Sequence, residues 1–301
     1  MVLSHCEMNG LFDALYFDLF SENVQDTFRI FVGKPNPVIP DQRYPTLFTL
    51  DGNISFPSLL GTQRMLIQGA EVPPSFVVGI GYPGDSLAEA MINRNRDYIP
   101  SKPGEAEARA LGQVSHVGGP AFLQFLEEEL KPLLAQHFPV DLEDSTLQGT
   151  SLGGLFASWV LLTRPETFQK YILCSPAIWW RNEQVFEWEE AYASNNDDLP
   201  ASVFIGAGEL EVAEHLRTDA AAIAKKNPAM SALIENVISW NDANGWPEVA
   251  KLTPQFADRL RARNYPALAI HCHNMPDENH MSASPALSSR GLRYVNQSWS
   301  P

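Results

Sequence analysis

The stretch Gln148-Gly149-Thr150-Ser151-Leu152-Gly153-Gly154 decides how the rest of the sequence is interpreted. It has the pattern Gly-x-Ser-x-Gly, which is typical of a serine on a sharp turn between a strand and a helix. Such a serine takes a strained backbone conformation with positive φ, and the residues two positions before and after it come close together. Only very small residues fit there, and Gly149 and Gly153 occupy the two positions.

The flanking sequence favours this interpretation over a serine that merely caps a helix in a tight turn. Residues 144–148 form a short, rather polar strand candidate, and residues 171–176 form a better one. Between them, apolar residues recur at helical spacing, and Arg164-Pro165 marks the expected end of that helix. Strand, turn, helix and strand are the context that a nucleophilic serine of this type requires.

Composition limits the classes of partner. The chain of 301 residues is 45% apolar, and its 36 acidic residues outnumber 21 basic ones, giving a net charge of −15 at pH 7. A surface this acidic argues against binding to nucleic acid or to an anionic membrane. The three cysteines are scattered, which argues against a disulfide framework and fits a reducing compartment.

The first 19 residues lack the basic region of a signal peptide, and no apolar run reaches the roughly 18 residues of a membrane helix. These features predict a cytoplasmic protein without a membrane partner.

Strand patterns alternate with helical patterns along the chain, which predicts a mostly parallel sheet with helices on both faces. We expect strands at residues 27–32, 46–50, 75–81, 201–208 and 267–273, and helices at 58–67 and at 119–137, the latter kinked at Pro132. Residues 83–118 are rich in Gly, Pro and charge and are expected to form a long loop. Residues 212–262 are expected to be helical and polar, with an irregular segment at 240–247.

A serine on such a turn needs a histidine base, and the base needs an acid that orients it. His280 is favoured as the base because it follows the last strand on a loop, where ligands bind in parallel sheets. His271 and His273 lie within a strand pattern, and His215 lies in a helical run. For the acid, Glu209 and Glu211 both follow the 201–208 strand and remain alternatives.

An oxyanion needs two backbone N–H donors. One is expected from Leu152, the residue after the serine, and the other from Asn53 in the Asp51-Gly52-Asn53 turn after the 46–50 strand. Trp179 and Trp180 follow another strand and are candidates for lining a substrate pocket, although large aromatics are more often core residues. His271-x-His273 with Asp277 and His280 is a weaker alternative as a metal site; we expect no metal and no cofactor.

Taken together, these residues resemble the putative esterase family of α/β hydrolases, which includes esterase D (S-formylglutathione hydrolase) and the enterochelin esterases. The similar stretches occur in the family's order and cover most of residues 20–296. They are residues 46–53, 78–82, 94–100, 118–134, 149–180, 208–211 and 278–294. The resemblance implies Ser151 as nucleophile and His280 as base, and the Gly208–Glu211 segment favours Glu211 as the acid.

Two departures from the family are visible. Thr150 stands where the family often has His, and the region after Glu211 is longer than usual, which predicts an insertion within about 212–262 that forms a lid or an oligomer contact. Siderophore substrates are anionic and favour basic pockets, which a chain at −15 supports little.

We therefore expect residues 1–301 to form one α/β-hydrolase domain that cleaves a small-molecule carboxylic ester through an acyl-enzyme, as a possible homo-oligomer. The alternatives are a thioesterase or acyltransferase of the same fold, because the same residues serve these reactions, and a non-catalytic binding module.

Overall fold

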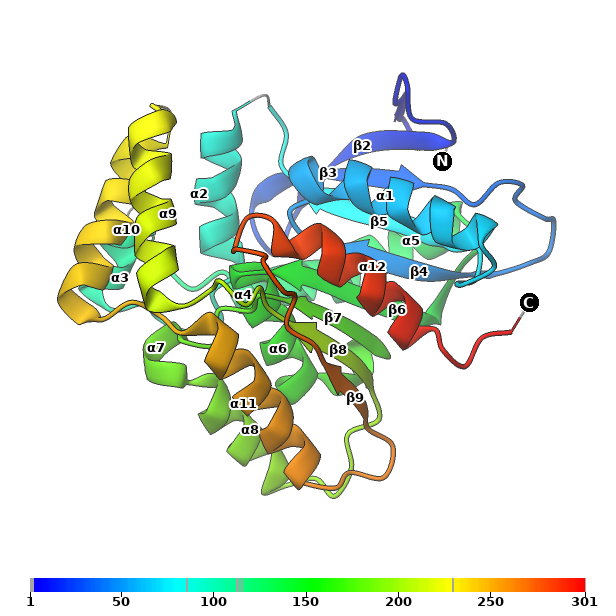
Figure 1. The fold of residues 1–301 in the computed structure, drawn as a ribbon. Coiled ribbons are helices and arrows are strands. Elements are labelled where there is room, and N and C mark those ends of the chain that lie inside the picture. The colour runs from blue at the N-terminus through cyan, green and yellow to red at the C-terminus, as the bar shows by residue number, and fades with distance from the viewer. Residues whose placement is uncertain (1–2, 85, 112–113, 115, 229, 301) are drawn as a thin grey trace.

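The computed structural model describes residues 3–84, 86–111, 114, 116–228 and 230–300. Within these residues the framework is one nine-stranded sheet in the order β1-β2-β3-β5-β4-β6-β7-β8-β9 (Figure 1). The β1–β2, β2–β3 and β3–β5 pairs are antiparallel, and all remaining pairs are parallel. The strands are β1 (Cys6–Glu7), β2 (Ala14–Ser21), β3 (Asp26–Gly33), β4 (Tyr44–Thr49), β5 (Phe76–Gly81), β6 (Val140–Thr150), β7 (Lys170–Cys174), β8 (Ser202–Gly206) and β9 (Ala269–Cys272).

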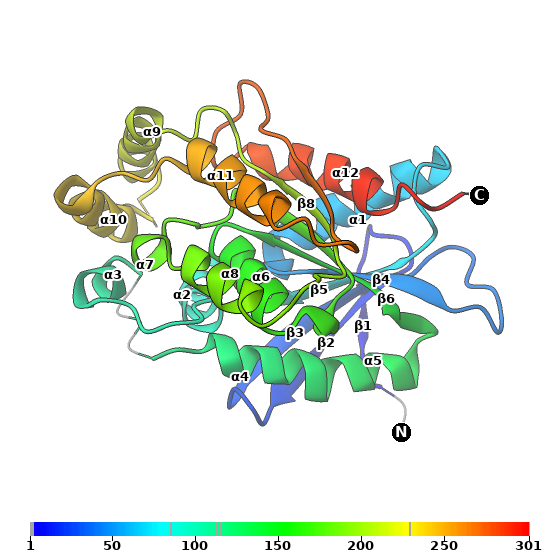
Figure 2. The same ribbon diagram turned by 90° about the horizontal axis from the view of Figure 1, so that it is seen from below.

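Helices cover both faces of the sheet, as Figure 2 shows. On one face, α1 and α12 bury Phe56 and Leu287, and on the other face α4, α6 and α11 bury Phe122, Phe156 and Phe256. The strands between these two layers are buried on both sides, so β5 is a continuous apolar run with every residue buried. The prediction of a mostly parallel sheet with helices on both faces is confirmed.

The helices, with two short helical turns, have the following bounds: α1 (Gly52–Gln68), α2 (Leu87–Asp97), α3 (Glu105–Ala110), α4 (Gly119–Gln124), the π-helical turn η1 (Phe125–Leu130), α5 (Lys131–His137), α6 (Leu152–Thr163), the 3₁₀ turn η2 (Pro165–Thr167), α7 (Trp180–Glu183), α8 (Val185–Ala193), α9 (Ala213–Lys226), α10 (Ser231–Asn244), α11 (Val249–Ala262) and α12 (Ala283–Val295). None of the described helices is long and apolar enough to cross a bilayer.

Two helices stand apart from the layers. α9 and α10 lie beyond the carboxyl ends of the parallel strands, at the left of Figure 1. They pack mainly against each other, and α10 also packs against α3, whereas α11 packs directly on β8 and β9. The α9–α10 pair therefore overhangs the edge of the sheet at which residues 149–154 lie; this turn, predicted from the sequence to carry a nucleophile, is called the nucleophile turn below.

The structure corrects three element predictions. The expected loop at 83–118 contains α2 and α3, and the Ser86 hydroxyl caps α2 by accepting the N–H of Glu89; residues 85, 112, 113 and 115 of this stretch lie outside the described residues. α1 begins at Gly52, directly after Asp51, and not at residue 58. α10 continues to Asn244, so only the first half of the 240–247 segment is helical, and Gly245 with φ of 97° ends it.

These differences have a local cause. Short helices bounded by Gly, Pro and charged residues have weak periodic signals and the composition of a loop, so the sequence pattern does not distinguish them from one.

The predicted 119–137 helix is present as α4, η1 and α5 in succession, and Pro132 lies in the first turn of α5, directly after the π-helical turn. A π-helical turn accommodates the backbone disturbance that a proline causes in a helix.

Backbone crowding shapes the turn between β6 and α6. Ser151 has φ of 59° and ψ of −118°, as the sequence pattern predicts. A Cβ atom on Gly149 would lie 2.3 Å from the carbonyl oxygen of Gly153, and one on Gly154 would lie 2.9 Å from Cα of Pro176. A Cβ atom on Gly153 would have its nearest neighbour, a side-chain carbon of Leu50, at 3.4 Å. The second position that excludes a side chain is therefore Gly154 and not Gly153.

We expect Gly149→Ala to lower the free energy of unfolding by about 1–3 kcal/mol or more, because its methyl group would overlap backbone that has no free space to move into. Gly153→Ala is the matched control and should stay near the parent stability. Urea unfolding followed by circular dichroism measures both. Equal stability of the two variants would contradict this account of the turn.

Candidate active site

A cavity of about 810 Å³ opens at the carboxyl edge of the sheet, beside the nucleophile turn. Ser151, Leu152 and His280 all border it. Ser151 comes from the turn after β6, and His280 from the loop between β9 and α12. Ser151 and His280 are 129 positions apart in the sequence, and the fold places both at one cavity large enough for a small-molecule ligand.

Glu211 contacts His280. Its carboxylate oxygen Oε2 lies 2.5 Å from Nδ1 of His280, and its side chain is fully buried while that of His280 is 31% exposed. Glu209, the other candidate, is exposed. The chain turns after β8, because the N–H of Glu211 bonds to the carbonyl of Gly208 at 3.1 Å, and this turn directs the two side chains to different places.

The second oxygen of Glu211 is held by neutral donors. The Ser175 hydroxyl donates to Oε1 at 2.5 Å, and the N–H of Gly208 donates to the same oxygen at 2.7 Å. Burial alone would raise the pKa of this carboxyl, but the hydrogen bond and attraction to His280, with the bonds from Ser175 and Gly208, lower its pKa below the ordinary value. Glu211 is therefore held as a carboxylate.

Backbone contacts fasten the two loops that carry Glu211 and His280. The N–H of Glu209 donates to the carbonyl of Met275, and that of Leu210 to the carbonyl of Glu278. The approach is so close that a Cβ atom on Gly208 would lie 2.1 Å from the Glu278 oxygen. The chain also returns to the acid after α9 and α10, because the N–H of Ala250 donates to the carbonyl of Glu211 at 3.0 Å.

The other histidine candidates lie elsewhere. His271 is exposed on β9, the edge strand, and its ring lies 6.3 Å from that of His273, centroid to centroid. His215 is exposed on α9. Among the described residues there is no group of three or more His, Cys, Asp or Glu side chains placed to hold a metal ion.

The two expected N–H donors lie at the starts of two helices. Leu152 opens α6 and borders the cavity. Asn53 is in the first turn of α1; its neighbours Asp51 and Ile54 border the cavity, while Asn53 borders a small adjoining hollow. The Asn53 side chain exchanges two hydrogen bonds with the backbone of Tyr82, at 2.9 and 2.8 Å. These bonds fix the start of α1 against the end of β5.

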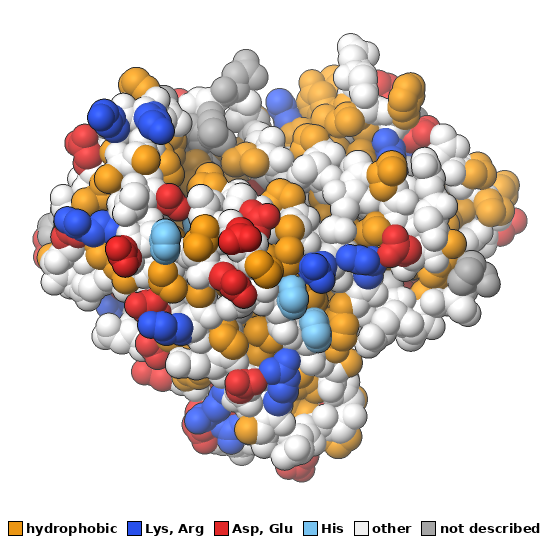
Figure 3. Space-filling model, viewed as in Figure 1, with side chains coloured by type: hydrophobic (Ala, Val, Ile, Leu, Met, Phe, Trp, Pro, Cys, Tyr) orange, Lys and Arg blue, Asp and Glu red, His pale blue; other side chains and the backbone are white. Residues whose placement is uncertain are grey.

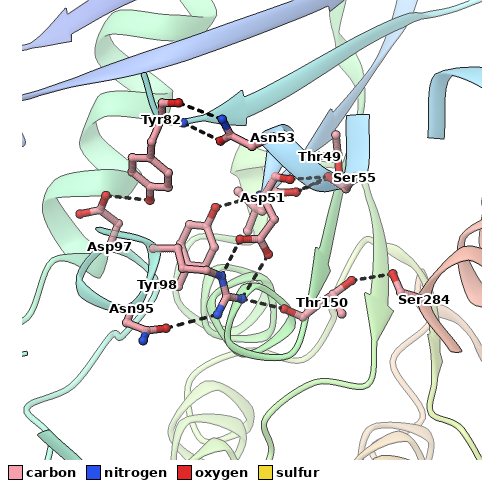
Figure 4. A network of polar contacts seen from close by, with 12 residues as sticks. Thr49, Asp51, Asn53, Ser55, Tyr82, Asn95, Asp97, Tyr98, Thr150 and Ser284 are labelled. Carbon is pink, nitrogen blue, oxygen red and sulfur yellow. Dashed lines mark hydrogen bonds and ion pairs between the residues drawn. The ribbon is translucent and has the colours of Figure 1, made fainter. Parts of the chain in front are cut away.

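Figure 4 shows a polar network around Asp51 that the sequence did not reveal. Asp51 has φ of 56°, and its carboxylate forms an ion pair with Arg94, Nε to Oδ1 at 2.5 Å and Nη2 to Oδ2 at 3.1 Å. Nη2 of Arg94 also donates to the carbonyl of Thr150 at 3.2 Å, and the Tyr98 hydroxyl accepts the N–H of Asp51 at 2.9 Å. Arg94 thus ties the start of α1 to the residue before Ser151.

The charge of Arg94 is kept by this pairing. Burial alone would lower the pKa of the guanidinium, but the ion pair with Asp51 raises it above the ordinary value. In the sequence, Arg94 is marked only by its place in the 94–100 stretch that resembles the esterase family, and this resemblance does not show what the arginine contacts. Ser175 had no signal beyond its place at a strand end.

Thr150, Trp179 and Trp180 also border the cavity. The Thr150 hydroxyl lies 2.8 Å from that of Ser284 on α12, which joins the nucleophile turn to the helix after His280. Trp180 is fully buried and its indole N–H donates to the Ser101 hydroxyl at 2.9 Å, whereas Trp179 is partly exposed and its ring faces Trp240 of α10.

Comparison with known proteins gives the family. Residues 21–244 match the family described as "Putative esterase". Ferri-bacillibactin esterase BesA of Bacillus subtilis is 35% identical over 202 residues, 64% of this chain and 68% of that protein. Apo-salmochelin esterase of Escherichia coli is 30% identical over 171 residues, 56% of this chain and 51% of that protein.

Solved structures agree in fold. The BES protein from Bacillus cereus is 28% identical with a TM-score of 0.73, and the match covers 98% of each chain. The siderophore hydrolase EstA from Aspergillus nidulans is 20% identical with a TM-score of 0.74, over 99% of this chain and 98% of that one, and shares the fold. The chain therefore belongs to the putative esterase family of α/β hydrolases and is a carboxylic ester hydrolase.

Proposed function

We propose that this esterase works through an acyl-enzyme on Ser151, with His280 as general base, Glu211 as the acid that orients it, and the N–H groups of Leu152 and Asn53 as oxyanion donors. The observation that carries the proposal is the 2.5 Å contact between the buried Glu211 carboxylate and Nδ1 of His280, beside a cavity that Ser151 also borders. Nδ1 bound to a carboxylate leaves Nε2 as the ring nitrogen that can accept a proton.

The first half of the reaction forms the acyl-enzyme. The Ser151 hydroxyl oxygen attacks the ester carbonyl carbon while Nε2 of His280 takes its proton. The tetrahedral oxyanion accepts hydrogen bonds from the backbone N–H groups of Leu152 and Asn53. His280 then returns the proton to the alkoxide, the carbon–oxygen bond of the ester breaks, and the alcohol leaves.

Water completes the cycle. His280 removes a proton from a water molecule, whose oxygen attacks the acyl carbon, and the acid is released as the proton returns to Ser151. Glu211 stabilises the imidazolium that forms twice in this cycle, and its lowered pKa keeps it charged for this role. Because thioesters and acyl acceptors other than water use the same groups, thioesterase and acyltransferase activity remain alternatives, and a binding module without activity is the third.

Ser151→Ala should reduce the hydrolysis of p-nitrophenyl acetate to about the uncatalysed rate, because no acyl-enzyme can form without the hydroxyl. In the parent protein a fluorophosphonate should add its mass to Ser151 alone, which peptide mass spectrometry reads directly. A fully active Ser151→Ala protein, or labelling of another serine, would refute the assignment. Failure of the parent protein to cleave any activated ester would favour the binding module.

The two glutamates of the β8–α9 loop provide a matched pair. Glu211→Gln removes the charge that stabilises imidazolium and should lower kcat by about 10³–10⁴ with a smaller change in KM, by analogy with the acid of serine proteases. Glu209→Gln changes an exposed charge and should cost less than about tenfold. Similar kcat values for both variants would mean that Ser151 and His280 act without an acid.

The lowered pKa of Glu211 also predicts a dependence of stability on pH. A carboxyl whose pKa is lower in the folded state stabilises the fold above its ordinary pKa of 4.5, and this contribution disappears as the pH falls through the lower folded value. The difference in melting temperature between the parent and Glu211→Gln should therefore narrow from pH 5.5 to pH 3. A constant difference for Glu211→Gln would contradict the predicted direction.

A further inference from the structure

The roof of the cavity is an apolar face made by α9 and α10. Leu216, Ala220 and Ile223 of α9 border the cavity at spacings of four and three residues, so they lie on one side of the helix. Leu233, Ile234 and Val237 of α10 also border the cavity, and Val237 follows the other two by four and three residues, so these three share one side of that helix. Ser151 and His280 border the same cavity at the edge of the sheet, and α9 also contributes the charged residues Asp219 and Lys226 to its lining.

This face is not packed as a core would be. Of the described side chains of α9, only Ala220 is buried, and of α10 only Asn241 is buried. The leucine, isoleucine and valine side chains that face the cavity keep part of their surface exposed. A helix pair whose role was only to stabilise the fold would bury its apolar face against another element, so these residues are available for an apolar ligand.

Aromatic and aliphatic side chains extend the apolar surface to the mouth of the cavity. The ring of Trp179 lies 5.9 Å from that of Trp240, centroid to centroid, and connects α10 to the loop after β7. Ile54 in the first turn of α1 is 56% exposed and Met281 next to His280 is 71% exposed, and both border the cavity. In Figure 3 hydrophobic side chains are visible between α9 and the start of α12.

The charged side chains around the cavity do not favour an anion. Three carboxylates border it, Asp51, Glu107 and Asp219, and two cationic side chains, Arg94 and Lys226. Arg94 is already engaged by the Asp51 carboxylate and the Thr150 carbonyl, and Glu107 is paired with Arg181 at 3.5 Å. Among the described lining residues, Lys226, exposed in the last turn of α9, is the one cation outside these pairs, and Asp219 on the same helix opposes it. An anionic substrate would therefore gain little from the lining, on a chain that carries −15.

We infer that the substrate is an uncharged ester with a long or bulky apolar arm that lies against the α9–α10 face. This rests on the proposed function of Ser151 and His280, because it places the ester group at those residues and the apolar arm under the two helices. The curated relatives are named for siderophores, whereas this inference rests on the apolar and charged side chains that border the cavity of this chain.

The test compares esters of equal length that differ in charge. With the intact protein, kcat/KM should rise by roughly twofold to fourfold per methylene from p-nitrophenyl acetate to the hexanoate, because each methylene is removed from water. Mono-p-nitrophenyl adipate, a six-carbon arm that ends in a carboxylate, should be cleaved at least about tenfold less efficiently than the hexanoate. Hexyl acetate against ethyl acetate, followed by pH-stat, tests the alcohol arm in the same way.

The outcomes separate this inference from the proposed function. If p-nitrophenyl acetate is not cleaved and Ser151 is not labelled, the proposed function fails and the inference fails with it. If the acetate is cleaved but neither series gains from a longer apolar arm, or the adipate monoester is the better substrate, only the inference is overturned.

A charge placed on the roof gives an independent test. Val237→Lys should lower kcat/KM for the hexanoate and raise it for the adipate monoester, so that the ratio of the two shifts by at least about tenfold. Ser239→Lys adds the same charge to an exposed position of α10 outside the cavity lining and should leave this ratio within about twofold of the parent. Val237→Thr, which keeps the shape but adds a hydroxyl, should lower the hexanoate-to-acetate ratio even if Val237→Lys does not fold. The inference would be overturned if the hexanoate-to-acetate ratio were the same in Val237→Thr, Ser239→Lys and the parent.

Discussion

The crowded backbone between β6 and α6 is the constraint on which the rest of the site depends. Gly149 and Gly154 leave no room for a side chain, and the residue between the two elements is consequently held with φ of 59°. The N–H of Ser151 bonds to the carbonyl of Cys174, and its own carbonyl accepts the N–H groups of Leu155 and Ala177. These bonds and contacts over-determine a conformation that a serine would otherwise avoid, and they direct its side chain toward the cavity.

A second strained residue is held in a comparable way across the site. Asp51 has positive φ at the start of α1, and Arg94 and Tyr98 bind its side chain and its N–H. Because Arg94 also binds the carbonyl of Thr150, the starts of α1 and α6 are fixed relative to each other by one buried guanidinium. Two helix starts that hold a fixed separation can present backbone N–H groups to one oxygen atom without reorganisation during the reaction.

The parts of the site that follow from short-range patterns could be predicted from the sequence. The nucleophile turn has a steric signature over seven residues, and His280 follows a clear strand pattern. The difference between Glu209 and Glu211 depends on a turn after Gly208 that no pattern encodes, so Glu211 could be favoured only through resemblance and through its place further out on the loop. The Asp51–Arg94 pair and the bond from Ser175 to Glu211 join residues 43 and 36 positions apart, and such contacts exist only once the sheet is assembled. The apolar faces of α9 and α10 were hidden for a related reason, since half-buried helices that carry polar or charged residues on their other side look like polar surface helices.

The hydrogen bond from Ala250 to the carbonyl of Glu211 closes the chain on itself at the base of α9 and α10. The excursion between these residues leaves from the acid and comes back to it, so its length and composition can vary without displacing the carboxylate. A different pair of helices, or a short linker, could connect Glu211 to Ala250 while the residues around Ser151 keep their positions. A change within this segment would alter the apolar face over the cavity, while Ile54, Trp179 and Met281 would still border the cavity from other parts of the chain.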